Sequence, residues 1–217
     1  MSAYNEKRLL VEGEEDKRVI PELIEANGIK WGDNERNWIV DVRQCGGIDK
    51  LLDKNLINTE LKASNLKIFG IIIDADESPA NRWKRVREIL ISRFPNIPEN
   101  LPSTGLIHKT PNDIKIGIWM MPDNQERGML ETFLKFLLPN KSNKLWELSE
   151  NVCQQASSLN APFKSTHEDK AKIHTWLAWQ NPPGRQLHNA VMEKILFPSS
   201  PYAATFINWF RELFEIT

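Results

Sequence analysis

The stretch FGIIIDADES, residues 69–78, runs from apolar residues directly into two aspartates, Asp74 and Asp76, with a glutamate behind them. Side chains two positions apart on a strand point the same way, so both carboxylates can face one location where the strand ends. The pattern recurs in KRLLVEGEED (7–16) and IKIGIWMMPDNQE (114–126), which also run from apolar residues into acids. A chain that ends several buried strands in acids is expected to gather those acids at one edge of a sheet.

The composition is that of a soluble globular protein with one domain, or one domain and an appendage: 217 residues, 41% hydrophobic and 26% charged. Its net charge of −1 indicates no class of partner. No apolar run approaches the ~20 residues that span a bilayer, and the N-terminus lacks the apolar core of a signal peptide. Cys45 and Cys153 alone make neither a disulfide framework nor a cysteine-rich zinc site. We therefore expect a cytoplasmic protein without a membrane partner.

The spacing of apolar residues predicts strands that alternate with helices. Strands are expected at 7–11, 38–42, 66–74, 104–109 and 114–121, and helices at 15–26, 48–56, 79–93 and 125–138. Pro79 fits the first turn of its helix, whereas Pro21 is expected to kink its helix or to mark a later start. The turn TPND at 110–113 predicts one antiparallel pair of strands.

From about Lys141 onward only helices are expected, at 142–158, 167–180, 186–196 and 202–214. Strands alternating with helices predict an α/β fold with a mainly parallel sheet flanked by helices. We expect residues 1–140 to form this core and residues 141–217 to form a helical C-terminal extension packed on it, the two making one structural unit.

The acids at the strand ends form a candidate metal site. In open α/β sheets, ligands bind beyond the carboxyl ends of the strands. Glu12 follows the first strand and Asp123 follows the strand ending at Met121, so both meet Asp74 and Asp76 if these strands are neighbours. Carboxylates this close repel, and a divalent cation relieves the repulsion; oxygen ligands alone favour Mg²⁺ or Mn²⁺ over zinc. The alternative is that each acid is solvated or caps the helix that follows it.

Together the motifs resemble a known domain. V-E-G-E-E-D (11–16), followed by I-I-I-D-A-D (71–76), resembles the Toprim domain shared by topoisomerases, bacterial primases and OLD-type nucleases. With M-P-D-N…G-M-L-E (121–131) and K-A-K-I-H-T-W-L-A…F-I-N-W-F (170–210), nearly the whole chain is similar to a small, stand-alone Toprim-like family of unassigned function.

The resemblance implies roles for individual acids. Glu12 matches the Toprim glutamate, often cast as a general acid or base, and Asp74 and Asp76 match the metal-binding pair; these would be the catalytic residues. Asp16 matches an acid that some Toprim nucleases use for metal. The full set of implied metal ligands adds the family's later acids, which would complete a second metal position: Glu12, Asp16, Asp74, Asp76, Asp123 and Glu131. For Glu131, a solvated position on a helix is an equal alternative.

Several features of topoisomerases, primases and OLD ATPases are absent from the sequence. Glu77-Ser78-Pro79 replaces the usual continuation after the aspartate pair, and neither Tyr4 nor Tyr202 has a nucleophile setting. The sequence also lacks a Cys/His zinc module and a G-x-x-x-x-G-K-[ST] loop. Hydrolysis or binding therefore remains as the expected function.

Basic residues near the acids are candidates for holding nucleic-acid phosphates. Arg82, Lys84 and Arg85 follow the acidic strand end, and Lys170 and Lys172 precede two tryptophans. The alternatives are a solvated helix face for the first group and core packing for Trp176 and Trp179, which share helical spacing with Ile173.

The sequence thus predicts an Mg²⁺- or Mn²⁺-dependent phosphodiester hydrolase of the Toprim nuclease type, acting on DNA or RNA. Its partners would be nucleic acid and, beyond that, a protein partner or a second copy of the chain. The alternative is a non-catalytic Toprim-like module that binds nucleic acid or regulates a partner. A phosphatase of small phosphates is disfavoured, because its D-x-D normally ends the first strand and here ends the third.

Overall fold

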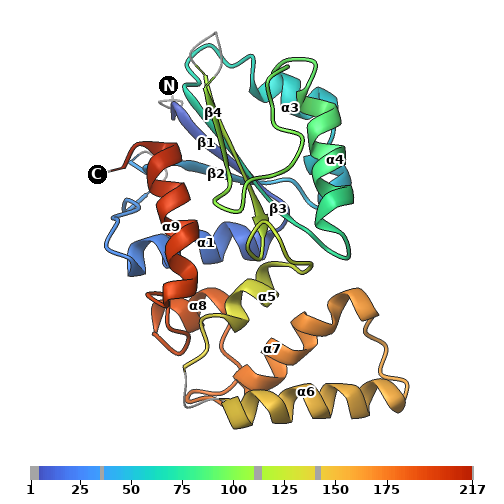
Figure 1. Ribbon diagram of the computed structural model, residues 1–217. Helices are drawn as coiled ribbons and strands as arrows, with labels where there is room; N and C mark the ends of the chain where they lie inside the picture. The colour runs from blue at the N-terminus through green and yellow to red at the C-terminus, as the bar shows by residue number, and fades with distance from the viewer. Residues whose placement is uncertain (1–4, 35–36, 110–113, 140–142, 217) are drawn as a thin grey trace.

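A computed structural model describes residues 5–34, 37–109, 114–139 and 143–216 of the chain (Figure 1). Its centre is a five-stranded sheet in the order β2-β1-β3-β5-β4. Neighbours from β2 to β5 run parallel, and β4 pairs with β5 in the antiparallel sense. The strands are β1 (Lys7–Val11), β2 (Asp41–Gln44), β3 (Ile68–Asp74), β4 (Leu106–Lys109) and β5 (Lys115–Met121). The predicted α/β fold with a mainly parallel sheet is confirmed.

Helices cover both faces of this sheet and continue beyond it. Those between the strands are α1 (Glu14–Ala26), α2 (Ile48–Leu51), α3 (Lys54–Glu60) and α4 (Pro79–Leu90). Those after the strands are α5 (Leu130–Lys135), α6 (Asn143–Ser158), η2 (Ser165–His167), α7 (Glu168–Ala178), α8 (Leu187–Met192) and α9 (Pro201–Phe214). None of the described helices is long and apolar enough to cross a membrane.

The sheet separates two hydrophobic cores, because parallel strands are apolar on both faces. On one face, Leu9 and Trp119 pack with α1, α5, α8 and α9; on the other, Leu10 and Ile71 pack with α2, α3 and α4. Helix α9 lies so close to the sheet that a Cβ on Gly117 would come within 2.4 Å of the Leu213 side chain. The last helix of the chain is therefore part of the core that the sheet requires.

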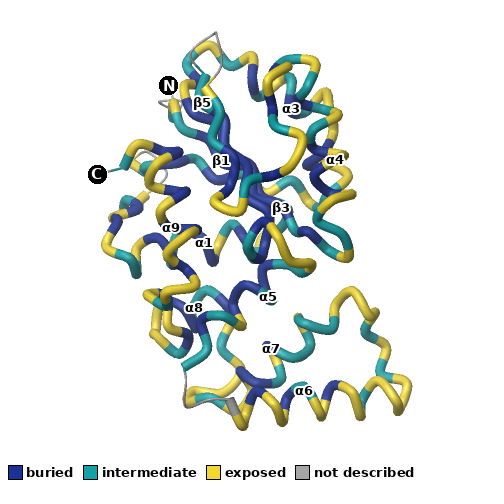
Figure 2. The backbone as a smooth tube through the Cα atoms, viewed as in Figure 1, coloured by how far each residue is buried: buried dark blue, intermediate teal, exposed yellow. Residues whose placement is uncertain are grey.

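The helices α6 and α7 lie side by side away from the sheet, and α5 lies between them and the strand ends (Figures 1 and 2). The Thr132 hydroxyl on α5 donates a hydrogen bond to the Asp169 carboxylate on α7 at 2.5 Å. This contact brings the start of α7 close to the end of the sheet where the acids lie.

Several element boundaries differ from the sequence prediction for local reasons. Strand β2 begins at Asp41, because the Ile39 N–H donates to the Trp31 carbonyl instead of pairing within the sheet. The helix expected at 48–56 is split into α2 and α3 because Asp53 caps the second of them. Pro21 lies inside α1, which begins at Glu14, so the later start was wrong.

The other boundary predictions had mixed outcomes. The helix expected at 125–138 is shortened to α5, because turns occupy the residues after β5. Pro79 begins α4 as predicted, with Ser78 as its cap. The turn at 110–113 lies outside the described residues.

Candidate active site

Acidic side chains from three separate junctions meet at the carboxyl ends of β1 and β3. Glu12 directly follows β1, and the Asp16 carboxylate in the first turn of α1 accepts the Gly13 N–H at 2.9 Å. Asp74 ends β3 and accepts the Leu130 N–H at 3.0 Å, which joins β3 to the start of α5. Glu131, the next residue on α5, is only 4% exposed. Its alternative interpretation as a solvated helix residue is therefore wrong.

The electrostatics shows that these acids act on one another. Burial raises the pKa of Asp16 to about 7; the Gly13 N–H opposes this rise, and the charges of Glu131 and Glu12 add to it. Burial also raises the pKa of Asp74 well above its usual value, with the charges of Asp16, Glu12, Glu131 and Asp76 acting in the same direction. Below, the term carboxylate cluster means Glu12, Asp16, Asp74 and Glu131.

Glu12 connects this cluster to Asp76. Burial and then the Asp76 charge raise the pKa of Glu12, while Arg82 and the backbone N–H groups of Asp74 and Ile48 lower it. The Glu12 Oε2 atom is buried and has no hydrogen-bond partner among the described residues. An unpartnered carboxylate oxygen inside a cluster of acids is an unusually costly arrangement, and a cation would relieve it.

Asp76 lies at the edge of the cluster and already has a positive partner. Its backbone has a left-handed φ of 51° and pairs with Gly128, whose N–H donates to the Asp76 carbonyl at 2.9 Å. The Asp76 carboxylate forms an ion pair with Arg82, a residue of α4 that is only 7% exposed. Arg82 therefore does not belong to a solvated helix face, and its buried Nε and Nη1 atoms have no hydrogen-bond partner among the described residues.

Asp123 does not join the other acids. Its carboxylate accepts the N–H groups of Gln125 at 3.0 Å and Glu126 at 2.7 Å, and so closes the turn that follows β5. Its charge is not among the causes of the raised pKa values in the carboxylate cluster. The structure thus places five of the six predicted metal ligands together and leaves Asp123 in a local turn.

The predicted lysine contacts divide between two positions on α7. The Lys170 ammonium lies 3.1 Å from the Glu131 carboxylate. Partial burial works against its charge, but Glu131 outweighs burial and raises the pKa of Lys170. Lys172 instead pairs within its own helix, with Glu168 at 2.9 Å. Lys170 is therefore the lysine of this pair that faces the acids.

The remaining predicted contacts lie at the surface or in the core. Lys84 and Arg85 are exposed on α4, and Arg85 pairs with Asp49 at 3.1 Å. Trp176 is fully buried, as expected for a core residue, whereas Trp179 is 40% exposed and the core interpretation fails for it.

The chemistry of the cluster suits a hard divalent cation, because its donors are carboxylate oxygens and one of them, Glu12 Oε2, has no hydrogen-bond partner within the described parts of the chain. The spacing of the carboxylates fits a metal ion less well than their chemistry does. Within the part of the chain that the structure describes, no group of three or more His, Cys, Asp or Glu side chains is arranged to hold a metal ion. Binding a cation would require the carboxylates to move closer together and the Asp76 carboxylate to release Arg82.

Sequence reasoning assigned Arg82 and Lys170 to nucleic acid and missed their ion pairs with acids of the site. For Arg82 a signal was present, since it lies six residues after Asp76, within the first turns of a helix that starts beside it. For Lys170 no local signal existed, because 39 residues separate it from Glu131.

Comparison with known proteins places the chain in a family. The family described as "Protein of unknown function (DUF3226)" matches residues 6–215. The chain belongs to this family. No curated protein matches it in sequence.

The fold of this DUF3226 member is similar to that of solved C-terminal regions of OLD proteins. The C-terminal region of the OLD protein from Xanthomonas campestris pv. campestris, in the structure phased with platinum, gives a TM-score of 0.51 at 12% identity, over 98% of this chain and 95% of that chain. The C-terminal region of the Burkholderia pseudomallei OLD protein gives 0.47 at 10% identity, over 97% and 99%. The expected similarity to OLD proteins is thus confirmed for the fold of their C-terminal region.

Proposed function

We propose that this protein is a divalent-cation-dependent phosphodiester hydrolase of the Toprim nuclease type, acting on DNA or RNA. The observation that carries the proposal is the carboxylate cluster at the carboxyl ends of parallel strands, where burial and neighbouring charges raise the pKa values of Glu12, Asp16 and Asp74. The fold shared with OLD C-terminal regions supports the same class of activity. Enzymes place coupled acids in this way to hold metal or to move protons, and a purely structural role does not require such a cost.

Within this proposal each residue has a defined task. Glu12 and Asp74 would hold Mg²⁺ or Mn²⁺, joined by Asp76 once Arg82 has left it. A cation bound there supplies charge neutralisation at the phosphate and an activated water. Asp16, whose pKa is raised to about 7, can take or give a proton near neutral pH. Lys170 orients Glu131, and the Nε and Nη1 atoms of Arg82, which no described residue contacts by a hydrogen bond, would donate to a phosphate oxygen.

The test is cleavage of plasmid DNA and of single-stranded RNA by the purified protein, with Mn²⁺, with Mg²⁺ and with EDTA. Asp74→Asn should abolish the cation-dependent cleavage, because it removes a charge from the centre of the carboxylate cluster. Glu88→Gln, which changes an exposed acid on α4, is the matched control and should cleave normally. Cleavage that persists in Asp74→Asn would show that another site is responsible.

A second function is favoured by a specific observation, the ion pair that already neutralises Asp76. If Arg82 replaces the metal permanently, the chain is a non-catalytic module that binds nucleic acid or a protein partner. This alternative predicts binding of DNA or RNA without cleavage under any cation, and no heat of Mn²⁺ binding in calorimetry. The two functions therefore give opposite results in the same pair of experiments.

A further inference from the structure

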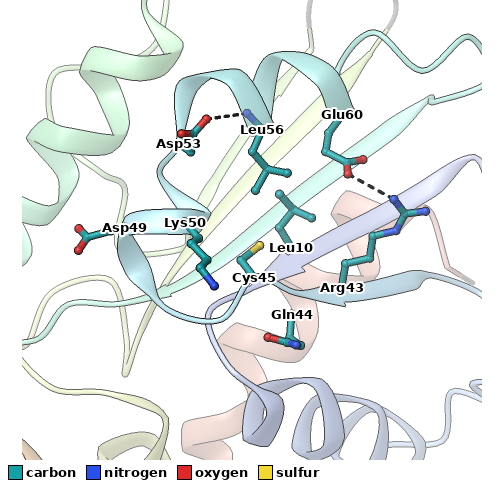
Figure 3. Close-up of a pocket in the computed structure, with 9 residues that line it drawn as sticks. All are labelled: Leu10, Arg43, Gln44, Cys45, Asp49, Lys50, Asp53, Leu56 and Glu60. Atoms are coloured by element: carbon teal, nitrogen blue, oxygen red, sulfur yellow. Dashed lines mark hydrogen bonds and ion pairs between the residues drawn. The ribbon is translucent and has the colours of Figure 1, made fainter.

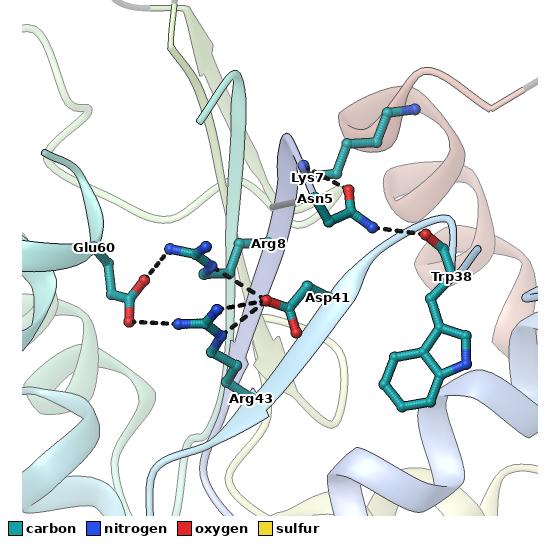
Figure 4. A network of polar contacts seen from close by, with 7 residues as sticks. All are labelled: Asn5, Lys7, Arg8, Trp38, Asp41, Arg43 and Glu60. Carbon is teal, nitrogen blue, oxygen red and sulfur yellow. Dashed lines mark hydrogen bonds and ion pairs between the residues drawn. The ribbon is translucent and has the colours of Figure 1, made fainter. Parts of the chain in front are cut away.

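A cavity of about 510 Å³ lies at the end of β2, against α2 and α3 (Figure 3). Its charged side chains are, in sequence order, Arg43, Asp49, Lys50, Asp53 and Glu60. Acids outnumber cations among them, so the lining does not favour an anionic ligand. Arg43 and Glu60 belong to a network with Arg8 and Asp41 that ties β1, β2 and α3 together (Figure 4). The charged groups of this cavity therefore support the edge of the sheet and select no ligand.

Another cleft opens onto Asp76, at the end of the sheet where the carboxylate cluster lies. Its volume is about 400 Å³. Asp76 and Gly128 line it from the strand ends, and Thr132 of α5 and Asp169 of α7 line it from the helices. The candidate active site and the first turn of α7 therefore border the same cleft.

A hydrogen bond between Thr132 and Asp169 joins α5 to α7 at this cleft. The Met129 N–H donates to the Thr132 hydroxyl oxygen at 3.0 Å. Because an N–H group can only donate, the hydroxyl proton of Thr132 goes to the Asp169 carboxylate, 2.5 Å away. A hydrogen bond to a charged carboxylate is among the stronger kinds in proteins. Thr132 thus ties the first turn of α5 to the first turn of α7.

The same turn of α5 holds two acids of the carboxylate cluster. The Leu130 N–H donates to the Asp74 carboxylate at 3.0 Å, and Glu131 is itself one of the buried acids. Leu130, Glu131 and Thr132 are consecutive, so a shift of this helical turn moves all three groups together. The bond from Thr132 to α7 therefore restrains the places of Asp74 and Glu131.

Thr132 also restrains the segment that pairs with Asp76. A Cβ on Gly128 would come within 2.5 Å of the Thr132 hydroxyl oxygen, so the two residues already lie in close contact. Gly128 and Asp76 exchange backbone hydrogen bonds at 2.8 and 2.9 Å. Both aspartates of the D-x-D pair, Asp74 and Asp76, are therefore connected to the turn that Thr132 fixes.

We propose that Asp169 is a positioning residue of the candidate active site. Through the Thr132 hydroxyl it fixes the first turn of α5, and this turn holds the Asp74 and Glu131 carboxylates in the carboxylate cluster. The inference rests on the proposed hydrolase, whose cation these carboxylates would meet. Groups that orient metal ligands from behind typically change metal affinity or activity by roughly 10–100-fold when they are replaced.

The first test needs no cation. Amide hydrogen exchange in EDTA measures how firmly the Leu130 N–H stays bonded to Asp74. We expect Asp169→Ala to raise the exchange rate of the Leu130 amide about tenfold, the factor that one hydrogen bond to a charged group represents. Asp169→Asn keeps an oxygen that can accept the Thr132 proton, so its Leu130 amide should exchange nearly as slowly as in the wild type.

The second test measures Mn²⁺ affinity by calorimetry. Asp169→Ala should bind Mn²⁺ about tenfold more weakly, and so should Thr132→Val, which removes the hydroxyl at nearly constant size. The double variant Asp169→Ala/Thr132→Val should lose no more affinity than Thr132→Val alone, because both changes remove the same bond. Thr132→Ser keeps the hydroxyl and should bind Mn²⁺ as the wild type does.

Glu168→Ala is the matched control. Glu168 also places a negative charge in the first turn of α7, but it pairs with Lys172 at 2.9 Å. Its removal should leave both the Leu130 exchange rate and the Mn²⁺ affinity at wild-type values. Urea unfolding of each variant checks that the fold is retained. Equal losses of Mn²⁺ affinity in Glu168→Ala and Asp169→Ala would show a general effect of charge and overturn the proposal.

The outcomes separate this inference from the hydrolase proposal. Faster Leu130 exchange and weaker Mn²⁺ binding in Asp169→Ala, with no cleavage of DNA or RNA by the wild type, would support the positioning role and refute the hydrolase. Cation-dependent cleavage by the wild type, with both readouts unchanged in Asp169→Ala, would do the reverse. A wild type that binds no Mn²⁺, or an Asp169→Ala variant that loses stability but keeps its Mn²⁺ affinity, would also overturn the positioning role.

Discussion

Replacing Asp16 by Asn tests whether burial in the carboxylate cluster opposes the ionisation of Asp16. Asp16 is 7% exposed and accepts the Gly13 N–H at 2.9 Å. Asparagine has the same size, and its side-chain oxygen can accept the same N–H, but it carries no charge. We expect Asp16→Asn to stabilise the protein at neutral and higher pH when no divalent cation is present.

The magnitude follows from the pKa of Asp16, which folding raises from 3.8 to about 7. Between these pH values the folded state holds the proton and the unfolded state does not, so the free energy of unfolding falls as the pH rises. At about 1.4 kcal/mol per pKa unit, the gap amounts to on the order of 4 kcal/mol. This cost is absent below the unfolded pKa and complete above the folded one. It is an upper limit, because the charges of Glu131 and Glu12 contribute to the shift and the pKa of Asp16 is not independent of its neighbours.

The assay is urea unfolding in EDTA at about pH 5 and about pH 8, followed by tryptophan fluorescence, to which buried residues such as Trp119 and Trp176 contribute. The difference in free energy of unfolding between Asp16→Asn and the wild type should be larger at the higher pH than at the lower pH. Asp33→Asn, at an exposed acid, is the control and should show no such difference. Added Mn²⁺ should reduce the difference in stability between Asp16→Asn and the wild type, because it stabilises the wild type. Parallel pH dependences for wild type and Asp16→Asn would refute the reasoning.

Two further substitutions test other contacts of the site and the core. Arg82→Gln removes the competitor for Asp76, so calorimetry should show Mn²⁺ binding about tenfold more tightly. Lys84→Gln should bind Mn²⁺ as the wild type does, and weaker binding by Arg82→Gln would contradict competition. Gly117→Ala places a Cβ within 2.4 Å of Leu213, so it should lower the free energy of unfolding by about 1–3 kcal/mol. In the same urea assay, the double variant Gly117→Ala/Leu213→Ala should lose less stability than the two single variants lose in sum. Losses that simply add would contradict the clash between the new Cβ and Leu213.

Much of the architecture could be predicted because it depends on short-range patterns. The apolar run of β3 requires cover on both faces, which selects a parallel sheet with helices on either side. Pro79 fixed the start of α4, since its missing N–H is tolerated only in a first turn. The acids after β1 and β3 were predicted to meet because parallel strands end at the same edge.

The makeup of the candidate site depended on contacts that no local pattern contains. Asp123 also follows a central strand, but two N–H groups of its own turn hold its carboxylate. Glu131 joins the acids because the neighbouring Leu130 N–H bonds to Asp74, 56 positions away in the sequence. Trp176 and Trp179 share a helical face by spacing, yet α7 buries only the first because it ends there.

The sequence by itself therefore determined that strands and helices alternate around a mainly parallel sheet, and that acids lie where strands end. Only the tertiary structure decided which acids are buried together, that Arg82 is buried beside them, and that Lys170 forms an ion pair with one of them at the surface. The physical reason is the range of the forces involved. Apolar periodicity and helix capping act over a few residues, whereas burial and charge depend on every group that folding brings within reach.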